Sequence, residues 1–148
     1  MKEAASTLSV GMLTLLAASL LSAWVMGGFS SHHRLPASLS AQAAELGISV
    51  IDTLQMREIV RSGSHLILDA RKTSDYDDGH IPTAFSVPVS KFEESFPMIA
   101  PMLLPDTPLV VYCSGPQCDD ALRLIERMRE AGVEAAVLYL EGMEGWNE

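Results

Sequence analysis

The sequence has few cysteines and few basic residues. Two cysteines among 148 residues are too few for a disulfide scaffold or a four-cysteine zinc site, yet they suffice for one bridge or one reactive thiol. Ten Lys and Arg stand against 19 Asp and Glu, and this formal charge of −9 argues against a nucleic-acid or anionic-lipid surface. The hydrophobic fraction of 48% excludes a wholly disordered chain, and the length fits a single folded domain.

A long uncharged stretch lies near the N-terminus. No charged residue occurs from residue 4 to residue 31, and residues 8–29 within it are rich in Leu, Ala, Met and Val. At about 1.5 Å of rise per residue, such a helix spans a hydrocarbon core of roughly 30 Å. We therefore predict a single-pass membrane anchor in residues 1–29, with a cleaved signal peptide as the alternative. Because the tail before the span is so short, we expect the domain on the periplasmic or extracytoplasmic side.

The segment after the anchor is expected to be a linker. Residues 30–46 are small and polar and contain one proline. His32 and His33 lie there without a third ligand nearby, so we interpret them as polar residues beside the membrane and not as a metal site. Residues 47–148 form the expected domain, for which the sequence implies no metal and no organic cofactor.

From residue 47 onwards, strand patterns alternate with helix patterns. Strands are predicted at residues 48–51, 66–69, 84–87, 109–112 and 136–140. Asp52 with Gln55, and Ser90 with Glu93, are spaced as helix-capping pairs. We predict helices from Asp52 to about Arg61, from Ser90 to the prolines Pro97 and Pro101, and after Cys113 to about Ala131, with a turn at 77–79 and a partial turn at 141–146. This alternation predicts an α/β domain with a mainly parallel sheet, whose functional loops follow the carboxyl ends of strands.

Cys113 is predicted to lie at one of those ends. It follows the apolar run 109–112 and precedes a helix, so loop N–H groups and the helix dipole favour its thiolate, the nucleophilic form. Asp119 and Asp120 oppose a thiolate by a similar amount, on the order of 1 kcal/mol, so the direction of the pKa shift stays open. The alternative is a buried, inert cysteine at the end of a core strand.

Several short motifs are spread along the chain in a fixed order. They are Leu68-Asp69-Ala70-Arg71, Tyr76-x-x-Gly79-His80-Ile81-Pro82-x-Ala84, Val87-Pro88, Val111-Tyr112-Cys113 and Leu140-Glu141-Gly142-Met143-Glu144-Gly145-Trp146. With these motifs, residues 47–148 resemble the rhodanese-like family. The resemblance implies a five-stranded, mainly parallel sheet flanked by helices, and sulfur transfer as the activity.

The resemblance also implies roles for single residues. Cys113 is the expected nucleophile, which takes a sulfane sulfur as a persulfide and passes it to a thiol acceptor. The loop residues expected to hold the outer sulfur with their amides are Ser114, Gly115, Pro116, Gln117 and Cys118. Asp69 and Arg71 are expected to support the site, although such a pair at a strand end is often purely structural. His80 is interpreted as a turn residue and Trp146 as packing at the edge of the core.

The sequence departs from the family at the end of this loop. Active members often have Arg where Cys118 stands, so the loop lacks a cation for thiosulfate, which favours a persulfide or polysulfide donor. Cys118 can resolve a Cys113 persulfide, form a redox switch with Cys113, or simply pack against the helix. A phosphatase is disfavoured because Asp119 takes the place of the oxyanion-binding Arg. A non-catalytic, membrane-tethered binding module remains the alternative function.

Overall fold

The computed structural model describes residues 38–104 and 106–148. The predicted anchor at residues 8–29, the first part of the predicted linker, and His32 and His33 lie outside these residues. Within the described ranges, no helix combines the length and the hydrophobicity that crossing a bilayer requires.

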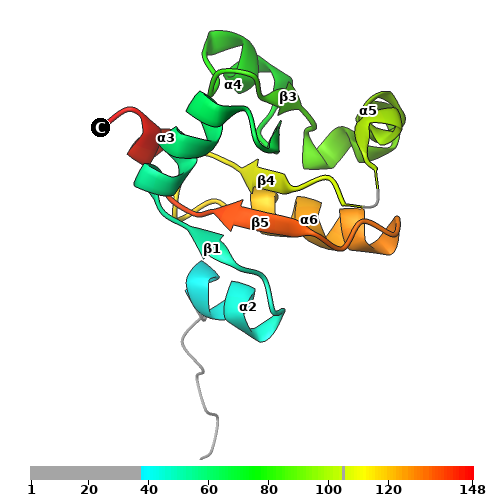
Figure 1. The fold of residues 1–148 in the computed structure, drawn as a ribbon, viewed down its shortest axis with the longest axis horizontal. Coiled ribbons are helices and arrows are strands. Elements are labelled where there is room, and N and C mark those ends of the chain that lie inside the picture. Colours follow the sequence, from blue (N-terminus) through cyan, green and yellow to red (C-terminus); the bar gives the residue numbers. More distant parts are fainter. Residues whose placement is uncertain (1–37, 105) are drawn as a thin grey trace, which may run out of the picture. The chain divides into compact units, whose positions relative to one another are not determined.

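Helices and strands alternate through the described chain (Figure 1). The strands are β1 (Val50–Ile51), β2 (Leu66–Asp69), β3 (Phe85–Ser86), β4 (Leu109–Tyr112) and β5 (Ala136–Tyr139). The helices are α2 (Leu39–Glu45), α3 (Thr53–Ser62), α4 (Thr73–Asp78), α5 (Phe92–Ile99), α6 (Asp120–Glu130) and α7 (Gly142–Trp146). Two short 3-10 turns, η1 (Val89–Lys91) and η2 (Ala100–Met102), flank α5.

The strands form one five-stranded sheet in the order β1-β5-β4-β2-β3. Every neighbouring pair is parallel, and β4 is central, with Leu68 of β2 and Leu138 of β5 both in register with Val111. This confirms the predicted parallel α/β architecture. Because the strands are parallel, the segments that follow β2, β4 and β5 meet at one edge of the sheet, where Cys113 lies.

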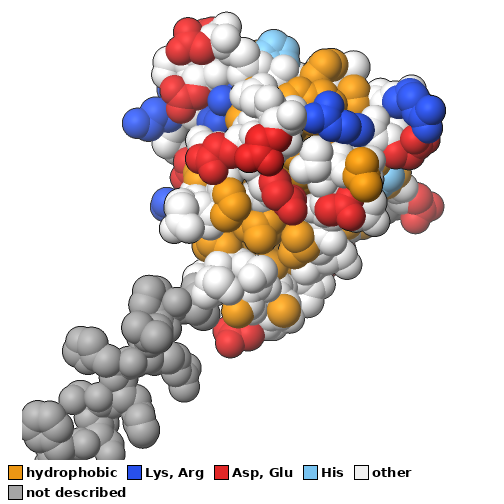
Figure 2. Space-filling model, turned by 90° about the vertical axis from the view of Figure 1, so that its left-hand side faces the viewer, with side chains coloured by type: hydrophobic (Ala, Val, Ile, Leu, Met, Phe, Trp, Pro, Cys, Tyr) orange, Lys and Arg blue, Asp and Glu red, His pale blue; other side chains and the backbone are white. Residues whose placement is uncertain are grey.

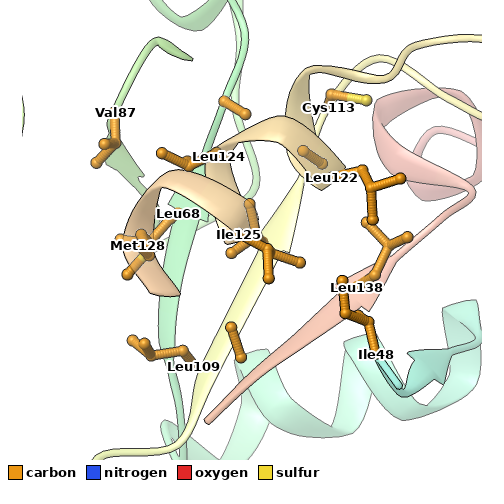
Figure 3. Packing of buried hydrophobic residues seen from close by; sticks show 14 of the residues in the cluster. Ile48, Leu68, Val87, Leu109, Cys113, Leu122, Leu124, Ile125, Met128 and Leu138 are labelled. Atoms are coloured by element: carbon orange, nitrogen blue, oxygen red, sulfur yellow. The ribbon is translucent and has the colours of Figure 1, made fainter. Parts of the chain in front are cut away.

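A hydrophobic cluster covers each face of the sheet. Side chains of β4 alternate between them, since Leu109 and Val111 join one cluster while Val110 and Tyr112 join the other. The first cluster includes residues of α2, α5 and α6, and Figure 3 shows part of it beneath α6. The second includes residues of α3, α4 and α7, and in Figure 1 the red C-terminal helix α7 lies beside α3.

Local sequence signals explain the ends of α3. The Asp52 carboxylate accepts a hydrogen bond from the Gln55 N–H (2.8 Å), and the Gln55 side chain accepts one from the Asp52 N–H (3.0 Å). This is the predicted capping pair. Gly63 ends the helix with a φ of +64°, a left-handed conformation that glycine adopts without strain.

The structure differs from the sequence predictions in three elements. Helix α4 was not expected, because its six residues are mostly polar and have no apolar period. Ser90 lies within η1 and does not cap α5, which begins after Lys91 and continues through Pro97 because Phe92 and Ile99 are anchored in the core. Helix α2 lies in the segment predicted to be a linker, and Ala43 packs its inner face into the first cluster.

Candidate active site

Cys113 directly follows strand β4, as predicted. All four residues of β4 are buried, and Cys113 itself is only 3% exposed. Figure 3 shows Cys113 at the upper edge of the first hydrophobic cluster, where β4 gives way to the loop before α6. The loop turns at Pro116 and Gln117, which are exposed, and closes with a hydrogen bond from the Cys118 N–H to the Gly115 carbonyl (3.0 Å).

The start of α7 fastens this loop to the domain. The Met143 N–H donates to the Cys113 carbonyl (3.0 Å), and the Glu144 N–H donates to the Ser114 carbonyl (2.9 Å). Gly142 permits this contact, because its φ is +56° and an added Cβ would lie 2.3 Å from the Cys113 carbonyl oxygen. No sequence pattern placed α7 at the site, although glycine, as in Leu140-Glu141-Gly142, is the residue type that allows a close backbone approach.

The Cys113 sulfur lies mainly among protein atoms. Its Sγ is 2.8 Å from the Cys118 carbonyl oxygen and 3.8 Å from that of Gly115, so it faces acceptors that suit a protonated thiol. Its hydrogen bond with the Cys118 thiol and its burial raise the pKa of Cys113, and the N–H groups of Gly115 and Ala121 oppose this only in part. The thiol form of Cys113 is therefore favoured at neutral pH.

Cys118 has the opposite tendency. It is partly exposed, and the hydrogen bond from Cys113 lowers the pKa of Cys118 to about 6, with help from the N–H groups of Ser114 and Asp120. Burial and the carboxylate of Asp120, 3.7 Å from Sγ, act against this. The two thiols thus share one proton, which stays on the more buried Cys113 and leaves the thiolate on Cys118.

The predicted ring of amides around Cys113 is therefore divided between two sulfurs. Gly115 and Ala121 turn their N–H groups to Cys113, whereas Ser114 and Asp120 turn theirs to Cys118. The mouth of the loop is acidic, and the Glu144 carboxylate lies against Gly115. Figure 2 views the domain from the end at which the strands terminate in Figure 1, and acidic side chains cross its middle with basic ones around them.

Asp69 and Arg71 lie beside Tyr112 and make no contact with a cysteine sulfur. Asp69 is fully buried and Arg71 is 8% exposed. The Arg71 guanidinium donates to Asp69 Oδ2 (2.6 Å) and to the Gly79 carbonyl (2.7 Å), while the Tyr112 hydroxyl donates to the same Oδ2 (2.6 Å). Burial and then the hydrogen bond to Asp69 raise the pKa of Tyr112. The network ties β2, β4 and the end of α4 together, so its support of the loop is indirect.

His80 and Trp146, which were also discussed from the sequence, both pack against other side chains. The His80 ring stacks on Tyr76, with centroids 3.8 Å apart, and its Nδ1 lies 3.0 Å from the Tyr76 carbonyl oxygen. Trp146 packs against the second hydrophobic cluster, beneath the guanidinium of Arg57 at 4.9 Å. In the described part of the chain, no group of three or more His, Cys, Asp or Glu is arranged to hold a metal ion.

A pocket beside the loop contains the cations that the loop itself lacks. It has a volume of about 170 Å³ and is lined by Ala70, Lys72, Val89, Ser90, Asp120 and Arg123. Asp120 links this pocket to the Cys118 sulfur. Lys72 follows β2 and Arg123 belongs to α6, so their approach depends on the fold. Because Lys72 and Arg123 are far apart in the sequence, no local pattern around Cys113 predicts this pair.

Comparison with known proteins gives a consistent family. The model of the Rhodanese-like domain matches residues 52–148. The HTH-type transcriptional regulator Rv0324 of Mycobacterium tuberculosis is 29% identical over 113 residues, which cover 74% of this chain and 48% of the regulator. A tRNA uridine(34) hydroxylase of Hamiltonella defensa is 33% identical over 63 residues, 41% of this chain and 18% of the hydroxylase. The chain thus spans about half, or less, of the length of these curated relatives.

Solved structures share the fold. The BH2092 protein of Bacillus halodurans has a TM-score of 0.60 at 22% identity, over 74% of this chain and 78% of that one. The human single-domain sulfurtransferase TSTD1 has a TM-score of 0.56 at 22% identity, over 66% of this chain and 94% of its own. A thiosulfate sulfurtransferase of Pseudomonas aeruginosa has a TM-score of 0.56 at 24% identity, over 71% of this chain and 20% of its own.

Proposed function

This chain belongs to the rhodanese-like domain family, and on that basis we propose that it is a sulfurtransferase that moves a sulfane sulfur through a Cys113 persulfide to a thiol acceptor. The observation that carries the proposal is the position of Cys113. It directly follows the central parallel strand, at the start of a loop fastened by α7, and its sulfur lies 2.8 Å from the carbonyl oxygen of a second cysteine, Cys118. A cysteine that served packing alone would need neither the loop nor the second thiol.

The direct test of this activity is cyanolysis. A persulfide on Cys113 would give up its outer sulfur to cyanide as thiocyanate, so the wild-type protein supplied with a sulfane donor should form thiocyanate over many turnovers. A variant that lacks both thiols, Cys113→Ala with Cys118→Ala, should form none above the rate of the donor alone. A rate equal to that of the wild type in this folded double variant would reject the proposal.

We propose a small persulfide with an anionic group as the donor. The pocket, which Asp120 connects to Cys118, has the size of a small thiol compound and is lined by Lys72 and by Arg123, which also pairs with Asp120 (3.9 Å). A carboxylate held there would place the sulfur end of the donor towards the loop, because Asp120 belongs to both the pocket and the surroundings of Cys118. Such charge pairing is sensitive to salt because the cations are exposed.

A charge variant tests the choice of donor. The persulfide of mercaptopropionate has a carboxylate, whereas the persulfide of mercaptoethanol is neutral and similar in size. Lys72→Gln should raise KM several-fold for the first donor and leave KM for the second unchanged. Lys91→Gln, which removes an exposed lysine that does not line the pocket, is the matched control. A Lys72→Gln variant with an unchanged KM for the anionic donor would refute the pocket's role.

A thiol–disulfide switch is the second candidate function, favoured by the hydrogen bond between Cys113 and Cys118. The similarity to a protein named as a transcriptional regulator is compatible with such sensing. Both cysteines are free in the structure. A switch would lose two hydrogen atoms reversibly under mild oxidation, which the intact mass detects, and would show no turnover in the cyanolysis assay. Either function would act close to a membrane if residues 8–29 form the anchor that we propose.

A further inference from the structure

Resting on the proposed function, we propose that the sulfane sulfur enters the protein at Cys118 and moves from there to Cys113. Cys118 is then a catalytic residue that receives sulfur from the donor, and Cys113 is the inner carrier. Four observations lead to this order of events: the exposure of the two thiols, the atoms around each sulfur, their mutual contact, and the position of the pocket.

The exposure of the two side chains separates their roles. Cys113 is 3% exposed and belongs to the first hydrophobic cluster, whereas Cys118 is partly exposed and only packs against that cluster. The loop does not hang free over Cys113, because Met143 and Glu144 hold its backbone from the side of α7. A donor from solvent therefore meets the sulfur of Cys118 first.

The atoms around each sulfur support the same order of transfer. The Cys113 Sγ is 2.8 Å from a carbonyl oxygen, which repels a thiolate and accepts from a thiol. The N–H groups of Ser114 and Asp120, together with the Cys113 thiol, face Cys118 and favour its thiolate, so the pKa of Cys118 is lowered to about 6. Attack on a sulfane sulfur requires a thiolate, and the exposed sulfur is the one that has it.

The contact between the thiols supplies the next transfer. The Cys113 Sγ lies 2.8 Å from the carbonyl oxygen of Cys118, and each thiol shifts the pKa of the other, so a sulfur atom on Cys118 would be carried close to Cys113. Neither cysteine lines the pocket that contains Lys72 and Arg123, but its lining residue Asp120 lies 3.7 Å from the Cys118 Sγ, so a donor held there would be near the receiving thiol.

The two steps balance without any external oxidant or reductant. First, the Cys118 thiolate attacks the outer sulfur of a donor R–S–SH, the donor S–S bond breaks, and its electron pair leaves with R–S⁻. Cys118 now carries –S–SH. Second, the Cys113 thiol gives its proton to the inner sulfur of the Cys118 persulfide, the resulting Cys113 thiolate attacks the outer sulfur, and the S–S bond on Cys118 breaks. The new bond is on Cys113, which carries –S–SH, and Cys118 is again a thiol ready to ionise.

Time-resolved mapping of the sulfur tests this order on the full chain. The protein is mixed with mercaptopropionate persulfide, quenched with an alkylating agent after increasing delays, and each cysteine is examined by tandem mass spectrometry. In wild type the persulfide should appear on Cys118 before Cys113. In Cys118→Ser, loading of Cys113 should be about ten-fold slower or more at neutral pH, because an ordinary or raised thiol pKa leaves little thiolate. In Cys113→Ala the sulfur should remain on Cys118.

The outcomes separate this inference from the proposed function. Loading of Cys113 at the wild-type rate in both Cys118→Ser and Cys118→Ala would overturn the inference and leave sulfur transfer intact. Release of sulfide with formation of a Cys113–Cys118 disulfide would also overturn it. Wild type that takes up no sulfur on either cysteine would overturn the proposed function itself. Circular dichroism confirms the fold of each variant. In the variants that lack Cys118, the loading of Cys113 should require a higher pH than in the wild type. A purely structural role of Cys118 would not produce this shift.

Discussion

At the residue scale, the central feature is one proton shared by two thiols. Burial and the carbonyl oxygens around Cys113 keep the proton on that sulfur, while Cys118 receives the hydrogen bond and the solvent access. The sequence alone left the direction of the pKa shift open, because the aspartates and the loop amides oppose each other. The structure resolves the balance by giving the two sulfurs different surroundings.

This arrangement predicts a distinctive pH profile for alkylation. The thiolate fraction of Cys118 should rise through pH 6, in line with its pKa of about 6, so its reaction with iodoacetamide should accelerate from pH 5 to about 7 and then level off. Cys113 should react slowly throughout this range because its pKa is raised. Peptide mapping of the alkylated protein measures both rates. A Cys118 rate that keeps rising up to about pH 8.5, as for an ordinary cysteine, would contradict the assignment.

The buried pair of Asp69 and Arg71 gives a second prediction at this scale. Arg71→Leu leaves a fully buried carboxylate without its cation, which should lower the free energy of unfolding by about 3–5 kcal/mol. Arg61→Leu is the matched control, because Arg61 and its ion-pair partner Glu58 are both largely exposed. This substitution should change the free energy of unfolding by less than about 0.5 kcal/mol. Denaturant unfolding of both variants measures the difference, and similar values would show that the network is not structural.

At the scale of elements, the site depends on α7 holding the loop that follows β4. Gly142 is the residue that allows the close approach, since its Cβ would meet the carbonyl of Cys113. This contact joins segments almost thirty residues apart, which is why the local motif around Cys113 does not reveal it. The glycine itself was visible in the sequence, but its partner was not.

Alanine substitutions at two glycines show how much this contact contributes to the free energy of unfolding. Gly142 and Gly63 have φ values of +56° and +64°, and an added Cβ meets nothing within 4 Å at Gly63. Gly63→Ala should therefore lower the free energy of unfolding by about 1–2 kcal/mol, which is the strain of a left-handed backbone alone. Gly142→Ala should lower the free energy of unfolding by clearly more, and it should also slow sulfur transfer, because the loop must shift. Equal losses of stability, measured by thermal unfolding, would argue against the role of α7.

Local signals were sufficient for most elements but not for the surroundings of the sulfurs. The capping pair of Asp52 and Gln55 and the apolar run of β4 are each set by neighbouring residues, and both were predicted. Helix α4 was missed because its sequence lacks an apolar period. The approach of Lys72 and Arg123, and the division of amides between the cysteines, depend on packing between distant segments, which no local pattern encodes.

At the scale of the whole molecule, the chain combines a rhodanese-like domain with an uncharged N-terminal stretch. The domain places the ends of β2, β4 and β5 at one edge, so the cations, the thiols and the fastening helix come from separate parts of the chain. From the formal charge of −9 we expect that the chain does not bind nucleic acid.

The N-terminal stretch yields a prediction for the full chain. If residues 8–29 are an uncleaved anchor, the protein should sediment with membranes and stay there in alkaline carbonate, because about 20 apolar residues hold a helix in the bilayer. A chain that begins at residue 36 is the control and should remain in the supernatant. Full-length protein that is released by carbonate, or that is recovered without its first residues, would rule out the anchor.

The most direct measurement of the central claim is the location of the transferred sulfur in the wild-type protein. After a single exposure to a persulfide donor and removal of the excess, tandem mass spectrometry of the cysteine-containing peptides should find the extra sulfur atom on Cys113, ready for release to an added thiol. A folded protein that carries no extra sulfur on Cys113, or whose bound sulfur no thiol can remove, would contradict the account.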